Sequence, residues 1–189
     1  MAIKLQGPWR AGWALDLHVL SSVLRGDGTY DTVRSELGQK LFELKYRNAR
    51  EHVEPLAEAA VGFIGTLLVR PYLSALVPVP PSTSRALQPV TEVARAIGHK
   101  TGLPVAEDYL RKTKPTQALK DIFDATERKA QLAGAFAVAD DRFAGKRVLV
   151  FDDLFRSGET LSEITHTLAD EGEVDRVYVL TLTRTRSLR

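Results

Sequence analysis

The segment VLVFDDLFRSGET, residues 148 to 160, constrains the fold more than any other part of the chain. Its first four residues are all apolar, and a strand without polar alternation has to be covered on both of its faces. Strands of this kind belong to parallel sheets that carry helices on either side. Two adjacent aspartates end the apolar run, and a short loop with basic, hydroxyl and glycine residues follows.

The rest of the chain alternates between strand patterns and helix patterns. Apolar runs predict strands over 75–79, 103–105, 147–151 and 176–183, and amphipathic spacing predicts helices that begin near Thr32, Pro55, Pro89 and Thr160. The run at 15–24 is apolar but ambiguous between helix and strand. This alternation predicts an α/β fold with a mostly parallel sheet flanked by helices.

Length and composition limit the domain organisation and the cellular setting. A chain of 189 residues suffices for one sizeable domain, so residues 1–189 are expected to form a single unit. The absence of cysteine excludes disulfides and cysteine-ligated zinc, and it favours a cytoplasmic location. A net charge of +2 is too small to indicate the basic stripe of a nucleic-acid-binding surface. The polar stretch 106–135 is either an irregular helix or a functional loop that closes over a ligand.

Asp152 and Asp153 follow the predicted strand at its carboxyl end, where parallel sheets bind their ligands. Successive strand residues face opposite ways, so at least one of these carboxylates can point toward a ligand while the other orients the loop. Carboxylates at this place suit the hydroxyl groups of a sugar diol, or a hydrated divalent cation. Both residues are therefore candidate catalytic residues.

The loop that follows the two aspartates has the composition of a phosphate cradle. Backbone amides at a helix start are unpaired and attract anions, and glycine allows the close approach of a ligand. Thr160 with Glu163 also fits a capping box, which would give this threonine a purely structural role. A ribose 5-phosphate carries both a diol and a phosphate. The candidate phosphate ligands are Arg156, Ser157, Gly158, Glu159 and Thr160.

Two other nucleotide-binding signatures are absent. An apolar strand that ends in acids also occurs in P-loop hydrolases, but those need G-x-x-x-x-G-K-[ST], which this chain does not contain. The string GDGTYD at 26–31 lacks the third glycine of a dinucleotide-binding fingerprint and follows no convincing strand.

His18 and His166 have no partner at metal-ligand spacing, so we expect them on solvent or helix surfaces. Trp9 and Trp13 are expected to be packing residues.

The segment VLVFDDLFRSGET resembles the signature by which type I phosphoribosyltransferases bind 5-phosphoribosyl 1-pyrophosphate (PRPP). It departs from that signature at Arg156, where a small residue is usual. Three further segments resemble the ComF branch, which is associated with bacterial competence, although its N-terminal zinc-binding cysteines are absent and RALQ replaces its arginine-glycine-phenylalanine-asparagine run. These segments are LKYRNAREHVEPLAEA at 44–59, LVPVPPSTSRALQPVTEVARAIGHKTGLPV at 76–105 and LRKTKPTQALKDIFDATERKAQLAGAFAV at 110–138.

The resemblance implies the type I phosphoribosyltransferase fold, with residues 1–40 as a small N-terminal hood and 106–135 as a flexible loop. It implies that Asp152 and Asp153 hold the ribose hydroxyls and that residues 156–160 bind the 5-phosphate. The stretch 183–186 would lie where such proteins cover the base. The pyrophosphate ligands implied in the same way are Ser82, Thr83, Arg85, Arg111 and Lys112.

The function that the resemblance implies is transfer of a phosphoribosyl group from PRPP to a nitrogen acceptor, with Mg²⁺ as cofactor and pyrophosphate as product. An alternative is a non-catalytic PRPP-binding protein, or a competence accessory in DNA uptake, and the competence role would bring nucleic acid in as a partner. Single-stranded DNA binding is a third class, and the small net charge argues against it. The resemblance is compatible with a homodimer, and the sequence predicts neither the acceptor nor the metal ligands.

Overall fold

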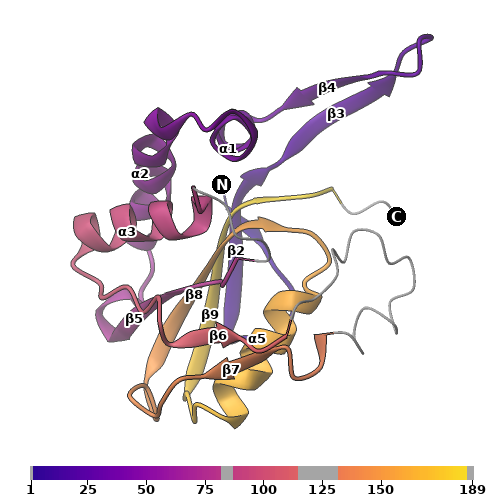
Figure 1. Ribbon diagram of the computed structural model, residues 1–189. Coiled ribbons are helices and arrows are strands. Elements are labelled where there is room, and N and C mark those ends of the chain that lie inside the picture. Colours follow the sequence, from indigo (N-terminus) through magenta and orange to yellow (C-terminus); the bar gives the residue numbers. More distant parts are fainter. Residues whose placement is uncertain (1, 82–86, 115–131, 187–189) are drawn as a thin grey trace.

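The computed structural model describes residues 2–81, 87–114 and 132–186. At its centre lies a five-stranded sheet in the order β1-β2-β9-β8-β5 (Figure 1). Strand β1 is antiparallel to β2, whereas β2, β9, β8 and β5 run parallel to one another. The strands span Ile3–Lys4 (β1), Ala11–Leu17 (β2), Leu73–Pro78 (β5), Arg147–Phe155 (β8) and Arg176–Arg184 (β9).

Helices cover both faces of this sheet, as Figure 1 shows. Helices α1, α2 and α3 pack on one face, and α5 packs on the other with the small sheet formed by β6 and β7. The expected α/β fold with a mostly parallel sheet is therefore confirmed. The helices span Glu36–Arg47 (α1), Val53–Ile64 (α2), Pro89–Thr101 (α3) and Glu159–Asp170 (α5), with short 3₁₀ turns at Arg50–His52 (η1) and Arg70–Tyr72 (η2).

Strand β8 supplies side chains to the cores on both sides of the sheet. Leu149 and Phe151 pack with the α1–α3 side, while Val148 and Val150 pack with the α5 side. All four side chains are completely buried. Full coverage on both faces explains why the four residues between Arg147 and Asp152 are all apolar.

The N-terminal region differs from expectation in one element. A helix was predicted from Thr32, but Tyr30–Arg34 forms strand β4, which pairs antiparallel with Val19–Leu24 (β3) in a hairpin that projects from the body (Figure 1). The helix starts only at Glu36, because Ser35 has an extended backbone and its hydroxyl caps the helix by accepting a hydrogen bond from Gly38 N at 3.0 Å. The ambiguous run at 15–24 divides between β2 and β3.

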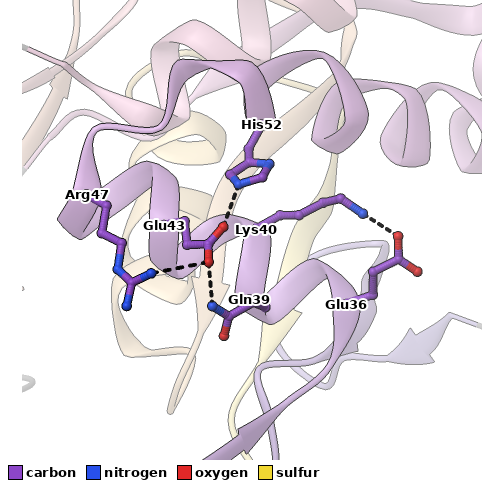
Figure 2. Close-up of polar contacts among 6 residues, drawn as sticks. All are labelled: Glu36, Gln39, Lys40, Glu43, Arg47 and His52. Atoms are coloured by element: carbon purple, nitrogen blue, oxygen red, sulfur yellow. Dashed lines mark hydrogen bonds and ion pairs between the residues drawn. The ribbon is translucent and has the colours of Figure 1, made fainter.

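Polar contacts at the surface of α1 link its successive turns and connect the helix to η1 (Figure 2). The Glu43 carboxylate accepts a hydrogen bond from Gln39 at 2.7 Å and lies 2.6 Å from His52 Nε2, so it joins α1 to η1. These hydrogen bonds, from Gln39 first and His52 second, lower the pKa of Glu43. Lys40 forms an ion pair with Glu36 one turn before it.

The start of α1 lies directly against the end of β2. A β-carbon added at Gly38 would fall 2.2 Å from the carbonyl oxygen of His18, and the Ser35 hydroxyl donates a hydrogen bond to the carbonyl oxygen of Leu17. Only a residue without a side chain fits at this crossing. The position of α1 relative to the sheet is therefore determined at its first turn.

We expect Gly38→Ala to lower the free energy of unfolding by about 1–3 kcal/mol, because the added methyl group forces helix and strand apart. Gly62→Ala is the matched control. Gly62 lies on the exposed side of the last turn of α2, and an added β-carbon there would have nothing within 4 Å. This variant is expected to stabilise by about 0.5–1 kcal/mol through helix propensity alone. Urea unfolding measures both, and a Gly38→Ala midpoint at or above that of the wild type would contradict this packing.

Candidate functional site

The carboxyl ends of β5, β8 and β9 meet at one rim of the sheet. Val79 N donates a hydrogen bond to Phe151 O at 2.9 Å, and Asp152 lies opposite Thr181 in the pairing of β8 with β9. The chain that leaves β5 therefore starts beside Asp152. The predicted pyrophosphate ligands Ser82, Thr83 and Arg85 follow in that connection and lie outside the described residues.

Asp152 and Asp153 turn to opposite sides of the sheet, as strand alternation predicts. Asp153 lies on the side of α1, where its carboxylate is 2.8 Å from Lys45 Nζ and the residue is only 8% exposed. Asp152 lies on the side of α5 and remains partly exposed. One of its oxygens accepts a hydrogen bond from the backbone N–H of Asp153 at 2.8 Å. The two carboxylates thus have different environments.

The Asp152 carboxyl is hard to ionise. Crowding by protein atoms and then the negative charge of Asp153 raise its pKa from 3.8 to about 7, against the smaller opposing effects of the Asp153 N–H and Lys45. Near neutral pH this group therefore exists in both protonation states. A carboxyl of this kind gains most from a partner that donates hydrogen bonds to its ionised form.

Lys45 was not singled out from the sequence, yet its side chain forms an ion pair with Asp153. Burial of the ammonium group lowers its pKa, but the charge and hydrogen bond of Asp153 outweigh this effect and the pKa is raised. Lys45 therefore stays charged and compensates the buried carboxylate. One feature of the sequence points to this position. Lys45 follows the buried Leu41 by one helical turn, so it lies beside the apolar face of α1.

The predicted phosphate loop lies between β8 and α5, as expected. Gly158 caps α5 with a left-handed backbone, φ 87°, and no side chain caps the helix. A β-carbon at Gly158 would fall 2.9 Å from the ring of Phe155, which packs edge-on against Trp9. Both the backbone conformation and the space therefore require glycine at this turn. The N-terminus of α5 lies at this turn, and a helix N-terminus favours negatively charged ligands.

The side chains of this loop take different positions. Arg156 is exposed, and the Ser157 hydroxyl donates a hydrogen bond to the Glu159 carboxylate. Thr160 lies inside α5 rather than at its cap, so the capping box expected from Thr160 and Glu163 does not form. Glu163 instead accepts a hydrogen bond from Gly134 N at 2.8 Å.

His18 reaches the same rim, which corrects the expectation that it lies on an exposed surface. Its Nδ1 is 3.2 Å from the Thr183 hydroxyl, which in turn lies 3.3 Å from the carbonyl oxygen of Asp153. Burial, followed by the positive charges of Lys45 and Arg34, lowers the pKa of His18. The N-terminal segment therefore contributes a neutral imidazole to the edge of the site.

The remaining predicted ligands lie on the ribbon of β6 (Leu110–Lys112) and β7 (Phe136–Val138). This ribbon packs beside α5 (Figure 1), and Arg111 donates a hydrogen bond to the carbonyl oxygen of Asp108 at 3.3 Å. Lys112 is partly buried, which lowers its pKa. The Arg111 side chain thus contacts the segment just before β6, and the loop that connects the two strands includes residues 115–131, outside the described part.

The described residues contain no cluster of three or more metal-ligating side chains. Magnesium does not need one, because it is commonly bound through one or two carboxylates, waters and substrate phosphates. Asp152 is a partly exposed residue and fits this pattern, whereas Asp153 is already paired with Lys45. The donor set is compatible with a magnesium ion that arrives with a phosphorylated substrate.

A hollow of about 400 Å³ lies elsewhere, near the amino end of β9. Its lining includes Arg10, Thr165, Asp175 and Arg176, and none of the predicted site residues.

In the part of the chain that the structure describes, no helix is long and apolar enough to span a bilayer.

Neither a family model nor a curated protein matches the chain, but solved structures do. The adenine phosphoribosyltransferase of Trypanosoma brucei, in complex with AMP, pyrophosphate and ribose 5-phosphate, superposes with a TM-score of 0.50 at 11% identity. The match covers 87% of this chain and 86% of that one. The chain has the phosphoribosyltransferase fold.

A second match is the glutamine PRPP amidotransferase of B. subtilis, complexed with ADP and GMP, with a TM-score of 0.50 and 15% identity. It covers 85% of this chain but only 35% of the amidotransferase, so the chain spans about a third of that enzyme. At these identities the likeness concerns the fold. It confirms the expected phosphoribosyltransferase architecture, and the assignment to the ComF branch stays a prediction.

We expect Asp152→Asn to raise the free energy of unfolding at pH 8 by about 1–2 kcal/mol, because a carboxyl whose folded pKa is raised destabilises the fold once it must ionise. The folded state holds this proton up to about pH 7, whereas the unfolded chain releases it near pH 4. Wild-type stability should therefore fall as the pH rises through this window, and the advantage of the variant should vanish at pH 4.

Urea unfolding at pH 4, 6 and 8 measures this dependence. Asp141→Asn, on an exposed loop, is the control and should change stability little at any pH. A stability difference between Asp152→Asn and wild type that stays constant from pH 4 to 8 would contradict the raised pKa.

Proposed function

We propose that this protein binds PRPP and transfers its phosphoribosyl group to a nitrogen acceptor, with release of pyrophosphate. The observation that carries the proposal is the position of Asp152 and loop 156–160 at the carboxyl end of one central strand, β8, in a phosphoribosyltransferase fold. A partly exposed carboxylate and a helix N-terminus there match the diol and the phosphate of a ribose 5-phosphate.

The phosphate would bind at the start of α5. The glycine turn at Gly158 allows close approach, and the backbone amides of the first helical turn would donate to the phosphate oxygens. The Ser157 hydroxyl, which now donates to Glu159, would donate to the phosphate instead. Arg156 is exposed next to this turn and would add positive charge.

The ribose hydroxyls would donate hydrogen bonds to Asp152. Its carboxyl has a raised pKa in the free protein, so these donors would favour the ionised form. Hydroxyl donors at this position and amide donors at α5 would together orient the sugar. The anomeric carbon would then face the rim where β5 and β9 end.

The reaction would form a bond between the acceptor nitrogen and the anomeric carbon while the bond from that carbon to the pyrophosphate oxygen breaks. The leaving pyrophosphate takes the electron pair, and fixed positive charges around it stabilise the charge that develops. Magnesium, when bound, would neutralise part of the pyrophosphate charge. Among this chain's own residues, Arg111 and Lys112 on β6 are proposed to supply positive charge to the pyrophosphate.

The acceptor would lie near the ends of β2 and β9, where His18, Thr183 and the stretch 183–186 border the site. A purine, a pyrimidine or a simple amine is compatible with this proposal. The ComF-like segments suggest that the physiological role is linked to competence, and a homodimer is part of the same proposal.

A non-catalytic PRPP-binding protein is the second candidate. Two contacts favour it: Asp153 is engaged by Lys45, and the Glu159 carboxylate occupies the phosphate loop through its contact with Ser157. Pyrophosphate release measured with a panel of bases and ammonia separates the two functions. Release with any acceptor supports the enzyme, and PRPP binding without release supports the binding protein.

We expect the wild type to bind ribose 5-phosphate, measured by titration calorimetry, and Ser157→Ala combined with Thr160→Val to weaken this binding by about 10-fold or more, because two donors to a charged phosphate are lost. Ser162→Ala, further along α5, is the control and should bind like the wild type. The proposal is wrong if the wild type binds neither ribose 5-phosphate nor PRPP with magnesium present.

A further inference from the structure

The ion pair between Lys45 and Asp153 connects helix α1 to the end of strand β8. The Nζ–Oδ2 distance is 2.8 Å, and the two side chains are only 20% and 11% exposed. Each partner lies next to the candidate site without belonging to the phosphate loop. This contact therefore decides where one of the two adjacent carboxylates is held.

A nearly buried ion pair constrains both partners. The loss of either charge leaves the other unpaired in a poorly solvated place, which is costly, whereas removal of both is often tolerated. The helix side of the pair is itself fixed, because Gly38 and Ser35 hold the first turn of α1 against the end of β2. Asp153 is thus paired with a residue of α1, a helix whose position relative to the sheet is fixed.

We propose that Lys45 is a positioning residue of the site, which holds Asp153 on the α1 side of the sheet and leaves Asp152 as the carboxylate that meets the ribose hydroxyls. This inference rests on the proposed function and deepens it. It assigns unequal roles to two neighbouring aspartates that the sequence presents as equivalent. It also gives α1, which carries no other predicted site residue, a part in ligand binding.

The surroundings of the two carboxylates support this division. Asp152 lies on the face of β8 from which the chain continues into loop 156–160 and α5, so its side chain and the phosphate cradle share one side of the sheet. The backbone N–H of Asp153 donates to Asp152, and the Thr183 hydroxyl lies 3.3 Å from the Asp153 carbonyl oxygen. The backbone that carries both carboxylates is therefore held by further contacts.

Removal of one partner should impair the site in either case. Without Lys45 the Asp153 charge is uncompensated beside Asp152, and the two carboxylates repel each other. Without Asp153 the Lys45 ammonium loses its carboxylate partner at the end of β8, and the position of the strand end that carries Asp152 is less well fixed. Removal of both should leave Asp152 in place.

The test compares two probes, ribose 5-phosphate and inorganic phosphate, by calorimetry without magnesium. The ratio of the two affinities reports the hydroxyl contact, whereas a variant that is merely less well folded loses both affinities together. We expect Lys45→Met and Asp153→Asn each to lower ribose 5-phosphate affinity by about 10-fold or more, with phosphate affinity changed less than about twofold. The double variant should return to within about threefold of the wild-type ratio.

Two further variants complete the design. Asp152→Asn should reduce ribose 5-phosphate affinity to that of phosphate in the wild-type and in the double-variant background. Lys40→Met removes a lysine from the same helix, where its partner Glu36 is 81% exposed (Figure 2), and should leave both affinities unchanged.

The outcomes are distinct. A double variant as weak as Lys45→Met would show that Lys45 contacts the ligand, and retained binding in Asp152→Asn would show that Asp153 meets the hydroxyls; either overturns the positioning role. Unchanged affinity ratios in the single variants overturn it as well, while wild-type binding of ribose 5-phosphate keeps the proposed function. A wild type that binds ribose 5-phosphate no better than phosphate would overturn the positioning role, and the proposed function falls with it if the wild type also fails to bind ribose 5-phosphate and PRPP with magnesium present.

Discussion

The double-sided burial of strand β8 is the constraint on which the rest of this structure depends. Its apolar residues supply both hydrophobic cores, so the strand cannot slide or tilt without opening one of them. The first polar residues after the apolar run, Asp152 and Asp153, are consequently held at a defined place at the rim. The loop that follows reaches α5 within a few residues, which brings the helix N-terminus to the same rim.

The N-terminal region then determines how those carboxylates behave. Strand β2 extends the sheet beside β9. The close crossing at Gly38 fixes α1 against the face of the sheet that α2 and α3 also cover. From this helix Lys45 compensates Asp153, while burial and the charge of Asp153 keep Asp152 from ionising easily. Two aspartates adjacent in sequence thereby acquire different partners, exposures and proposed tasks.

The likeness to phosphoribosyltransferases of 11% and 15% identity shows how little of the sequence this fold requires. What the fold requires is the alternation of buried strands with amphipathic helices and a polar loop at the carboxyl end of an interior strand. Function is carried by the site rather than by the fold. The proposed transfer therefore depends on Asp152 and loop 156–160 of this chain, and not on the likeness itself.

The sequence by itself determined the features that local chemistry controls. The buried run Val148–Phe151, the glycine turn at Gly158 and the helix after it could all be predicted, because apolar periodicity and backbone freedom act over a few residues. Only the tertiary structure decided the rest. Residues 30–34 form a strand because they pair with β3, His18 is partly buried because Thr183 lies beside it, and Lys45 meets Asp153 because α1 packs across the sheet. These contacts join residues distant in sequence, and no local pattern reports a partner that only chain folding brings within reach.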